Sequence, residues 1–208
     1  MQKCDMLVIG TGPAGLKAAI QAAKLGRKVI ITERKEVVGG VCINTGTIPS
    51  KTLREAVLYL TGYGLHNLYG HSYTVKSDVT MADLQLRTHH VIQREIDVIR
   101  DQMRRNGVIM MGGETSFTGP NTLLVKGLTA TSEVEADKIV IAVGTRPAQP
   151  PGVETDGETV LTSDQRTDLP LQDRHLLGTV HSMDLERQCV HVTLRLRTGT
   201  SPPRRSER

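Results

Sequence analysis

The chain has 208 residues, of which 38% are hydrophobic and 23% charged, a composition typical of a globular protein with one domain or slightly more. Its formal net charge is +4, but eight arginines and five acidic residues lie between Arg166 and Arg208, so this final segment holds three of the four surplus positive charges. The rest of the chain is nearly neutral, which argues against a nucleic-acid partner; binding through the arginine-rich end is the alternative.

The cysteines and histidines predict neither a disulfide framework nor a metal site. Cys4, Cys42 and Cys189 are odd in number and far apart, which favours a reducing compartment, and we expect the cytoplasm. His89 and His90 are neighbours and cannot share a helix face, so no metal is expected there. No run of about 18 apolar residues is present, so no membrane partner is expected.

The first elements in chain order are a strand, a helix and a second strand. Residues Met6 to Ile9 form an apolar run typical of a strand that is buried on both faces. Pro13 suits the first turn of a helix, and Gly26 is placed to end it. Residues Lys28 to Thr32 then predict a strand parallel to the first.

Two further helices are expected before a group of strands. The first begins near Ser50 and runs to about Leu60, and a loop follows from Tyr63 to Ser77. Thr80 and Asp83 resemble a capping box at the start of the second helix, which should end at Asn106 and Gly107. Its apolar residues recur at helical spacing: Ile92, Ile96, Ile99 and Met103.

The remaining pattern indicates a mixed α/β fold and then a change of composition. Strands are predicted at 108–111, 115–118, 122–125 and 138–143, with Gly, Pro or Asn between them. No Lys follows Lys138 and no Ile follows Ile141. We therefore expect one domain over residues 1–165 and an atypical tail over 166–208 that is disordered or read from a disrupted frame.

The stretch "VIGTGPAG" has the spacing of a dinucleotide-binding fingerprint. Gly10 permits a tight turn, Gly12 lets a pyrophosphate approach the backbone, and Gly15 lets the helix lie close to the strand. The phosphates would meet unpaired N–H groups around Pro13 and Ala14 and the positive end of the helix dipole. By itself the pattern is equally consistent with a tight turn.

Glu33 strengthens the interpretation of that fingerprint as a dinucleotide site. It ends the second predicted strand 18 residues after Gly15, where a carboxylate can accept hydrogen bonds from a ribose diol. A 2′-phosphate would be repelled there. FAD and NAD share this adenosine half, so the motif does not choose between them.

The stretch "GGVCINTGTIPSKTL" does choose, because it resembles the flavin face of the pyridine nucleotide-disulfide oxidoreductase family. That family usually carries two cysteines five residues apart, whereas this chain has Cys42 and, at the other position, Thr47. A hydroxyl cannot form an S–S bond, so a thiol–disulfide relay is excluded. The wording "GTIPSKTLREAVLYL" is similar to that of the soluble, flavin-dependent pyridine nucleotide transhydrogenases, and the resemblance runs from about Cys4 to Gln165.

The resemblance implies a Rossmann-like FAD-binding domain with an inserted helical segment and a small β-meander. It also implies hydride transfer between NADPH and NAD by way of FAD. Lys51 would lie near the flavin ring, where a cation stabilises negative charge on the reduced flavin, and Cys42 and Lys51 are the candidate catalytic residues. Alternatively, Lys51 is a solvated helix residue and Cys42 an inert thiol. The cofactor-binding residues implied here are Glu33, Arg34, Gly39, Gly40, Cys42, Thr47 and Lys51.

A second flavin signature is expected in "IVIAVGTRP". Gly144 and Thr145 match its turn, and the resemblance also assigns Thr115 to the cofactor site. Standing alone, the stretch would be only a buried strand and a turn.

The segments that should follow are missing from the sequence. No second glycine fingerprint for a nicotinamide nucleotide lies downstream, and Gly178 stands alone there. The family's C-terminal dimerisation segment is also absent, so a homo-oligomer of the family type is not expected. A non-catalytic FAD-binding fragment and a dihydrolipoyl dehydrogenase-like flavoprotein are the alternatives, and Thr47 argues against the latter.

Overall fold

The computed structural model describes residues 1–62, 70, 80–146, 152 and 154–155, and strands within 175–197. It divides into two compact units, one of 1–50 with 89–146 and one of 51–88 with 147–208. The predicted loop at 63–77 lies outside the described residues, apart from Gly70.

The first unit is built on a sheet with the strand order β3-β2-β1-β6-β5-β4. Strand β1 (Gln2–Ile9) pairs in parallel with β2 (Val29–Glu33) on one side and with β6 (Thr131–Ile141) on the other, and β2 pairs in parallel with β3 (Ile109–Gly112). The predicted parallel strand–helix–strand unit is therefore confirmed.

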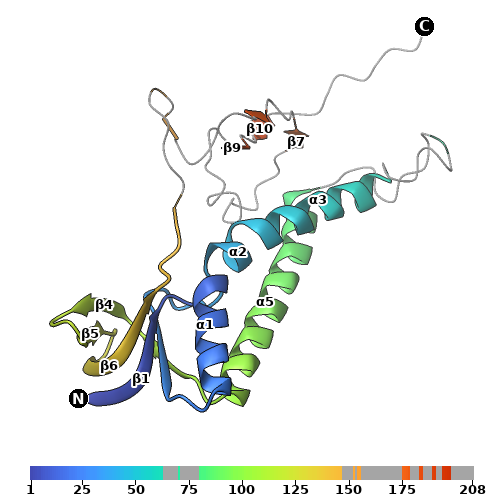
Figure 1. Ribbon diagram of the computed structural model, residues 1–208. Coiled ribbons are helices and arrows are strands. Elements are labelled where there is room, and N and C mark those ends of the chain that lie inside the picture. The colour runs from blue at the N-terminus through green and yellow to red at the C-terminus, as the bar shows by residue number, and fades with distance from the viewer. Residues whose placement is uncertain are drawn as a thin grey trace, which may run out of the picture. The chain divides into compact units, whose positions relative to one another are not determined.

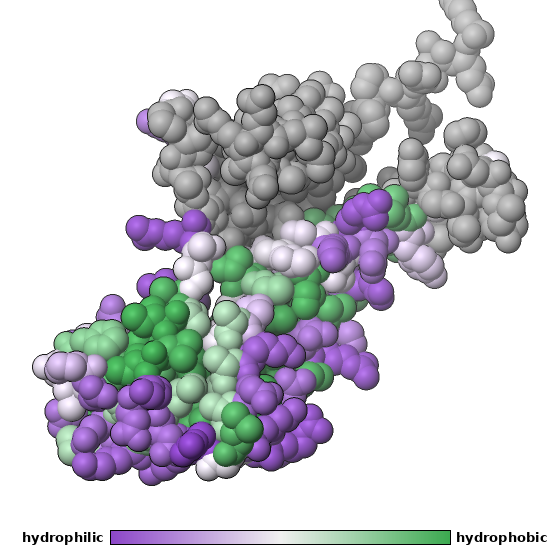
Figure 2. Space-filling view, viewed as in Figure 1, coloured by the Kyte–Doolittle hydropathy of each residue, from purple (hydrophilic) through white to green (hydrophobic). Residues whose placement is uncertain are grey.

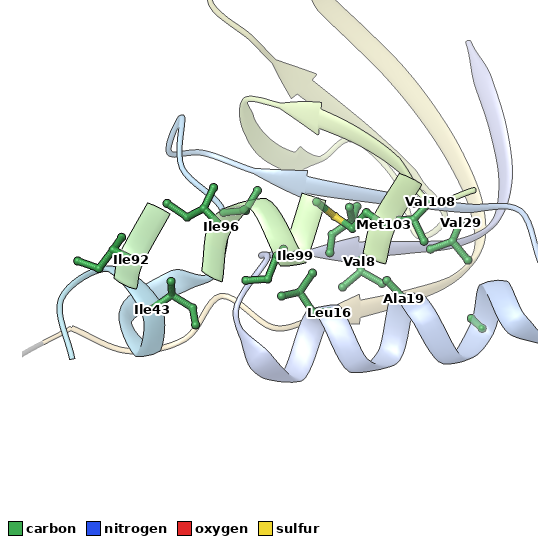
Figure 3. Close-up of a cluster of buried hydrophobic side chains, with 13 residues drawn as sticks. Val8, Leu16, Ala19, Val29, Ile43, Ile92, Ile96, Ile99, Met103 and Val108 are labelled. Atoms are coloured by element: carbon green, nitrogen blue, oxygen red, sulfur yellow. The ribbon is translucent and has the colours of Figure 1, made fainter. Parts of the chain in front are cut away.

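Two helices cover one face of the parallel strands (Figure 1). Helix α1 (Pro13–Lys24) follows β1, and the long helix α5 (Met81–Arg105) precedes β3. Figure 3 shows side chains of α1 and α5 meeting those of β1 and β2 in one apolar cluster. The predicted helical stripe of α5 is buried in this cluster: Ile92, Ile96, Ile99 and Met103.

A small meander supplies apolar contacts for the opposite face. Strands β4 (Glu114–Phe117), β5 (Thr122–Lys126) and the first half of β6 pair antiparallel. Successive side chains of β1 point to opposite faces of the sheet. Val8 packs in the apolar cluster on the helix side, and Leu7 packs in the apolar cluster that includes residues of the meander. This explains why the first strand is apolar without alternation.

The meander also departs from the predicted elements. Strand β6 begins at Thr131, seven residues before the predicted start at 138, and ends at Ile141 rather than at residue 143. Figure 2 shows apolar surface over the strand layer. Ile141, the last residue of β6, is 64% exposed, and Val143, just after the strand, is 66% exposed.

The helix starts follow from local sequence. The capping box is confirmed, because the Thr80 backbone N–H donates to Asp83 Oδ2 at 2.8 Å and the Asp83 N–H donates to Thr80 Oγ1 at 3.3 Å. Helix α3 (Thr47–Thr61) begins three residues before the expected Ser50. Within the part of the chain that the structure describes, no helix has the length and apolar composition that crossing a bilayer requires.

Two short antiparallel pairs lie in the second unit. Strand β7 (His175–Gly178) pairs with β10 (Leu194–Arg197), and β8 (Met183–Asp184) pairs with β9 (Cys189–Val190). These strands fall within the tail that the sequence predicts to be disordered. The domain boundary at 165 stays a prediction.

Candidate functional site

The candidate site lies where the carboxyl ends of β1, β2 and β6 meet. The Gly10 N–H donates to the Thr32 carbonyl at 2.8 Å, and the Ala142 N–H donates to the Ile9 carbonyl at 2.9 Å. The chain moves from β1 to β2 and β3 on one side of β1 and returns to its other side with β6. Ligands of open α/β sheets bind at such a reversal of strand order, outside the carboxyl ends.

Two fingerprint glycines are required by the fold itself. Gly10 has φ +104°, and a Cβ on it would lie 2.3 Å from the Ala142 carbonyl oxygen. A Cβ on Gly15 would lie 2.0 Å from the Gly10 carbonyl oxygen. Both distances are shorter than any real contact, so these glycines let β1, β6 and α1 approach each other.

Gly12 differs, because the space beside it is open. A Cβ on Gly12 would meet no atom within 4 Å, and its φ of −66° is accessible to any residue. It is the N-cap of α1, without a side-chain cap, and the first helical bond runs from the Leu16 N–H to the Gly12 carbonyl. Helix geometry therefore leaves the N–H groups of Ala14 and Gly15 without helical partners, while Pro13 has none to offer. Open space next to free N–H groups at a helix N-terminus fits a diphosphate.

Glu33 stands at the end of β2, facing the same loop. Its Oε2 accepts the Thr11 backbone N–H at 3.0 Å and the Thr11 hydroxyl at 2.5 Å, and its Oε1 accepts the Lys35 N–H at 3.1 Å. Arg34, which the resemblance assigned to the cofactor site, is exposed. The arrangement presents a half-buried carboxylate beside the Gly10–Gly12 turn, where it could accept hydrogen bonds from a hydroxyl group.

The glycine pair packs directly on this loop. Gly39 is buried with φ +99°, and its N–H is shared between the Thr11 carbonyl and the Thr11 hydroxyl, each at 3.2 Å. Gly40 has φ +61°, and a Cβ on it would lie 3.0 Å from the Gly12 Cα. The structure thus joins the two sequence motifs and adds Thr11, which sequence reasoning missed.

The other predicted residues are less closely grouped. The Thr115 hydroxyl donates to Thr32 Oγ1 at 2.9 Å, so this side chain already has a partner on β2. Gly144, with φ +70°, and Thr145 are exposed just after β6. Lys51 is exposed on α3 and belongs to the second unit.

The described residues contain no cluster of side chains suited to binding a metal ion. No group of three His, Cys, Asp or Glu side chains that could hold a metal ion occurs there. His89 and His90 are both exposed on α5.

Comparison with known proteins agrees with this geometry. A family model described as pyridine nucleotide-disulphide oxidoreductase matches residues 4–183. The chain belongs to this family. The family resemblance found in the motifs is thereby confirmed, and the Rossmann-like fold with it.

Relatives within the pyridine nucleotide-disulphide oxidoreductase family are longer than this chain. A soluble pyridine nucleotide transhydrogenase of Mycobacterium bovis (strain BCG / Pasteur 1173P2) is 56% identical over 171 residues, which cover 81% of this chain and 36% of the relative. A protein of the same name from Yersinia pestis (strain Pestoides F) is 37% identical over 175 residues, 83% of this chain and 37% of its own. The chain thus spans about a third of the length of these relatives.

A solved structure shows the same fold. The Cu(II) complex of the HOCl-induced flavoprotein disulfide reductase RclA from Escherichia coli is 25% identical, with a TM-score of 0.60 over 73% of this chain and 31% of that one.

The family is named for disulfide chemistry, but the Gly39–Leu53 motif of this chain contains one cysteine, Cys42. Cys42 is a free, half-buried cysteine in the short helix α2 (Gly40–Asn44), and Thr47 is the exposed first residue of α3. A redox disulfide between these two positions is chemically impossible.

Proposed function

We propose that residues 1–165 form an FAD-binding domain and that the intact protein transfers hydride between NADPH and NAD. The observation that carries the proposal is the open space beside Gly12, at a helix N-terminus and close to the Glu33 carboxylate. The names of the relatives, soluble pyridine nucleotide transhydrogenases, support the reaction. Bound FAD would supply the hydride-transfer chemistry.

The roles of this chain's residues follow from their chemistry. The N–H groups at the start of α1 would bind the diphosphate, and Glu33 would accept a hydrogen bond from the adenosine ribose. Gly39 and Gly40 would keep side chains out of the phosphate space. Lys51 would direct a positive charge toward the flavin, and Cys42 would line the site; these two are the proposed catalytic residues. Arg34, Thr47, Thr115, Gly144 and Thr145 are further proposed cofactor contacts.

A second candidate function is a non-catalytic FAD-binding module. The geometry supports it as directly as it supports the enzyme, because the open space beside Gly12 and the nearby Glu33 carboxylate bear on cofactor binding and not on hydride transfer. A dihydrolipoyl dehydrogenase-like activity is disfavoured, since Thr47 cannot complete a redox disulfide. We also propose a cytoplasmic location, nicotinamide nucleotides as partners rather than nucleic acid or membrane, and no family-type homo-oligomer for this chain.

The deciding experiment is an absorption spectrum of the purified chain, followed by a hydride-transfer assay. Flavin absorbance together with transfer from NADPH to an NAD analogue supports the enzyme, and flavin absorbance without transfer supports the module. A folded chain that is colourless and takes up no added FAD refutes both.

A further inference from the structure

The buried Thr11 joins three parts of the candidate site that lie far apart in the sequence. It is the middle residue of the Gly10–Gly12 turn, and it is fully buried. Its hydroxyl donates its one proton to Glu33 Oε2 at 2.5 Å and accepts the Gly39 N–H at 3.2 Å. Its own N–H donates to the same Glu33 oxygen at 3.0 Å. One side chain therefore connects the phosphate loop, the ribose-facing acid and the glycine turn.

These bonds leave a defined part of the carboxylate for a ligand. A carboxylate has about four acceptor positions, two on each oxygen. Among the described residues, Thr11 uses both positions of Oε2, and the Lys35 N–H uses one position of Oε1. One position on Oε1 remains, so Oε1 is the oxygen that Glu33 offers to a hydroxyl.

We propose that Thr11 is a positioning residue for adenosine-ribose recognition: its hydroxyl holds the Glu33 carboxylate so that Oε1 faces the ribose diol. The inference rests on the proposed function. A glutamate side chain that its ligand must immobilise weakens binding, because the side chain loses conformational entropy when the ligand binds. A carboxylate already held by several hydrogen bonds, as the half-buried Glu33 carboxylate is, avoids this loss.

The test compares FAD with an FAD analogue whose adenosine ribose lacks the 2′ and 3′ hydroxyls, using quenching of flavin fluorescence to measure Kd. Thr11→Val keeps the methyl group and removes the hydroxyl. We expect it to weaken FAD binding about tenfold, as loss of a hydrogen bond to a charged group implies, and to leave the affinity for the analogue unchanged. An equal loss with both cofactors, or no loss with either, overturns the proposal.

A second pair of variants separates the hydroxyl from packing. Thr11→Ser and Thr11→Ala both lack the methyl group and differ only in the hydroxyl, so this pair decides the question if Thr11→Val does not fold. Thr11→Ser should bind FAD within about threefold of the unchanged chain, and Thr11→Ala about tenfold more weakly than Thr11→Ser. Equal FAD affinity of the two contradicts the proposal. Thr88→Val is the matched control, since it removes another buried hydroxyl, one that donates to the Leu84 carbonyl at 2.9 Å.

A flavin-free measurement distinguishes failure of this inference from failure of the proposed function. Thr11→Val, Glu33→Gln and the double variant are compared by urea unfolding of the full chain. We expect the double variant to shift the midpoint by less than the summed single shifts, since Glu33→Gln weakens, by removal of the charge, the same hydrogen bond that Thr11→Val removes. Additive shifts overturn the inference alone. A folded, unchanged chain that binds no FAD refutes the proposed function, and the inference with it.

Discussion

At the residue scale, Gly12 and Gly15 belong to one motif but have separable purposes. Gly12→Val places its side chain in open space, so we expect a folded protein whose FAD affinity falls at least about a hundredfold, because the phosphate contacts are blocked. Gly15→Val is the contrasting variant, since its Cβ would meet the Gly10 carbonyl, and it should lose the fold. Circular dichroism and FAD fluorescence check both variants. Stoichiometric FAD in folded Gly12→Val would contradict the phosphate assignment.

The sequence motifs make the glycines and Glu33 candidate site residues, but they do not mark Thr11. A fingerprint written G-x-G-x-x-G leaves its second position unspecified, so nothing local marks Thr11 as special. Its significance comes from partners 22 and 28 residues away, Glu33 and Gly39. Only the fold brings these groups within hydrogen-bond distance. A hydroxyl residue inside the glycine turn, together with an acid at the end of the next strand, is the signal that could have found it.

At the element scale, α5 should contribute to stability through one face. Ile96 is 2% exposed within the helix-side cluster, whereas Val98 is 44% exposed on the same helix. Ile96→Ala should lower the free energy of unfolding by about 2–5 kcal/mol, since it removes buried methyl groups and leaves a cavity. Val98→Ala should change it by less than about 0.5 kcal/mol. Urea denaturation measures both, and similar losses for the two variants would show that the face is misassigned.

Elements with local signals were predicted well, and elements that depend on distant pairing were not. In helix α5 a capping box marks the start of the helix, and an apolar stripe marks its buried face. The first half of β6 offers only alternate apolar residues, Val134 and Ala136, between acidic ones. It pairs with β5 on one side, where Lys126 lies opposite Thr131, and from Val134 onward with β1 on the other, where Gln2 lies more than a hundred residues earlier. Pairing on both sides makes the segment a strand.

At the scale of the whole molecule, the buried Cys4 should make stability fall at alkaline pH. Burial raises the pKa of the Cys4 thiol above its ordinary value of 9.0. As pH rises past 9.0 the unfolded chain loses this proton while the folded chain keeps it, so unfolding becomes easier until the folded pKa is reached. Cys4→Ala should lose less stability than the unchanged chain on going from neutral to alkaline pH. Urea midpoints at several pH values check this, and an identical decline in both chains would exclude Cys4 as the cause.

Whole-molecule organisation was the least accessible to sequence reasoning. The compact unit of 1–50 with 89–146 is discontinuous along the chain, a feature that the predicted boundary at 165 does not address. Amino-acid composition shows only where the types of residue change along the chain, whereas a compact unit is defined by the segments that pack together. Residues 89–105 join the first segment because the apolar stripe of α5 packs against α1 and the sheet, which no compositional trend reveals.

Glu33 also has a main-chain role at the corner between β3 and β4. Its carbonyl accepts the Gly113 N–H at 2.8 Å, and Gly113 has no room for a Cβ, which would lie 2.7 Å from the Lys126 carbonyl oxygen. The peptide that anchors the meander and the carboxylate proposed to recognise the ribose thus belong to one amino acid. A shift of the backbone at this corner would therefore act directly on the proposed ribose contact through Glu33, beside the route through the pairing of β6 with β1.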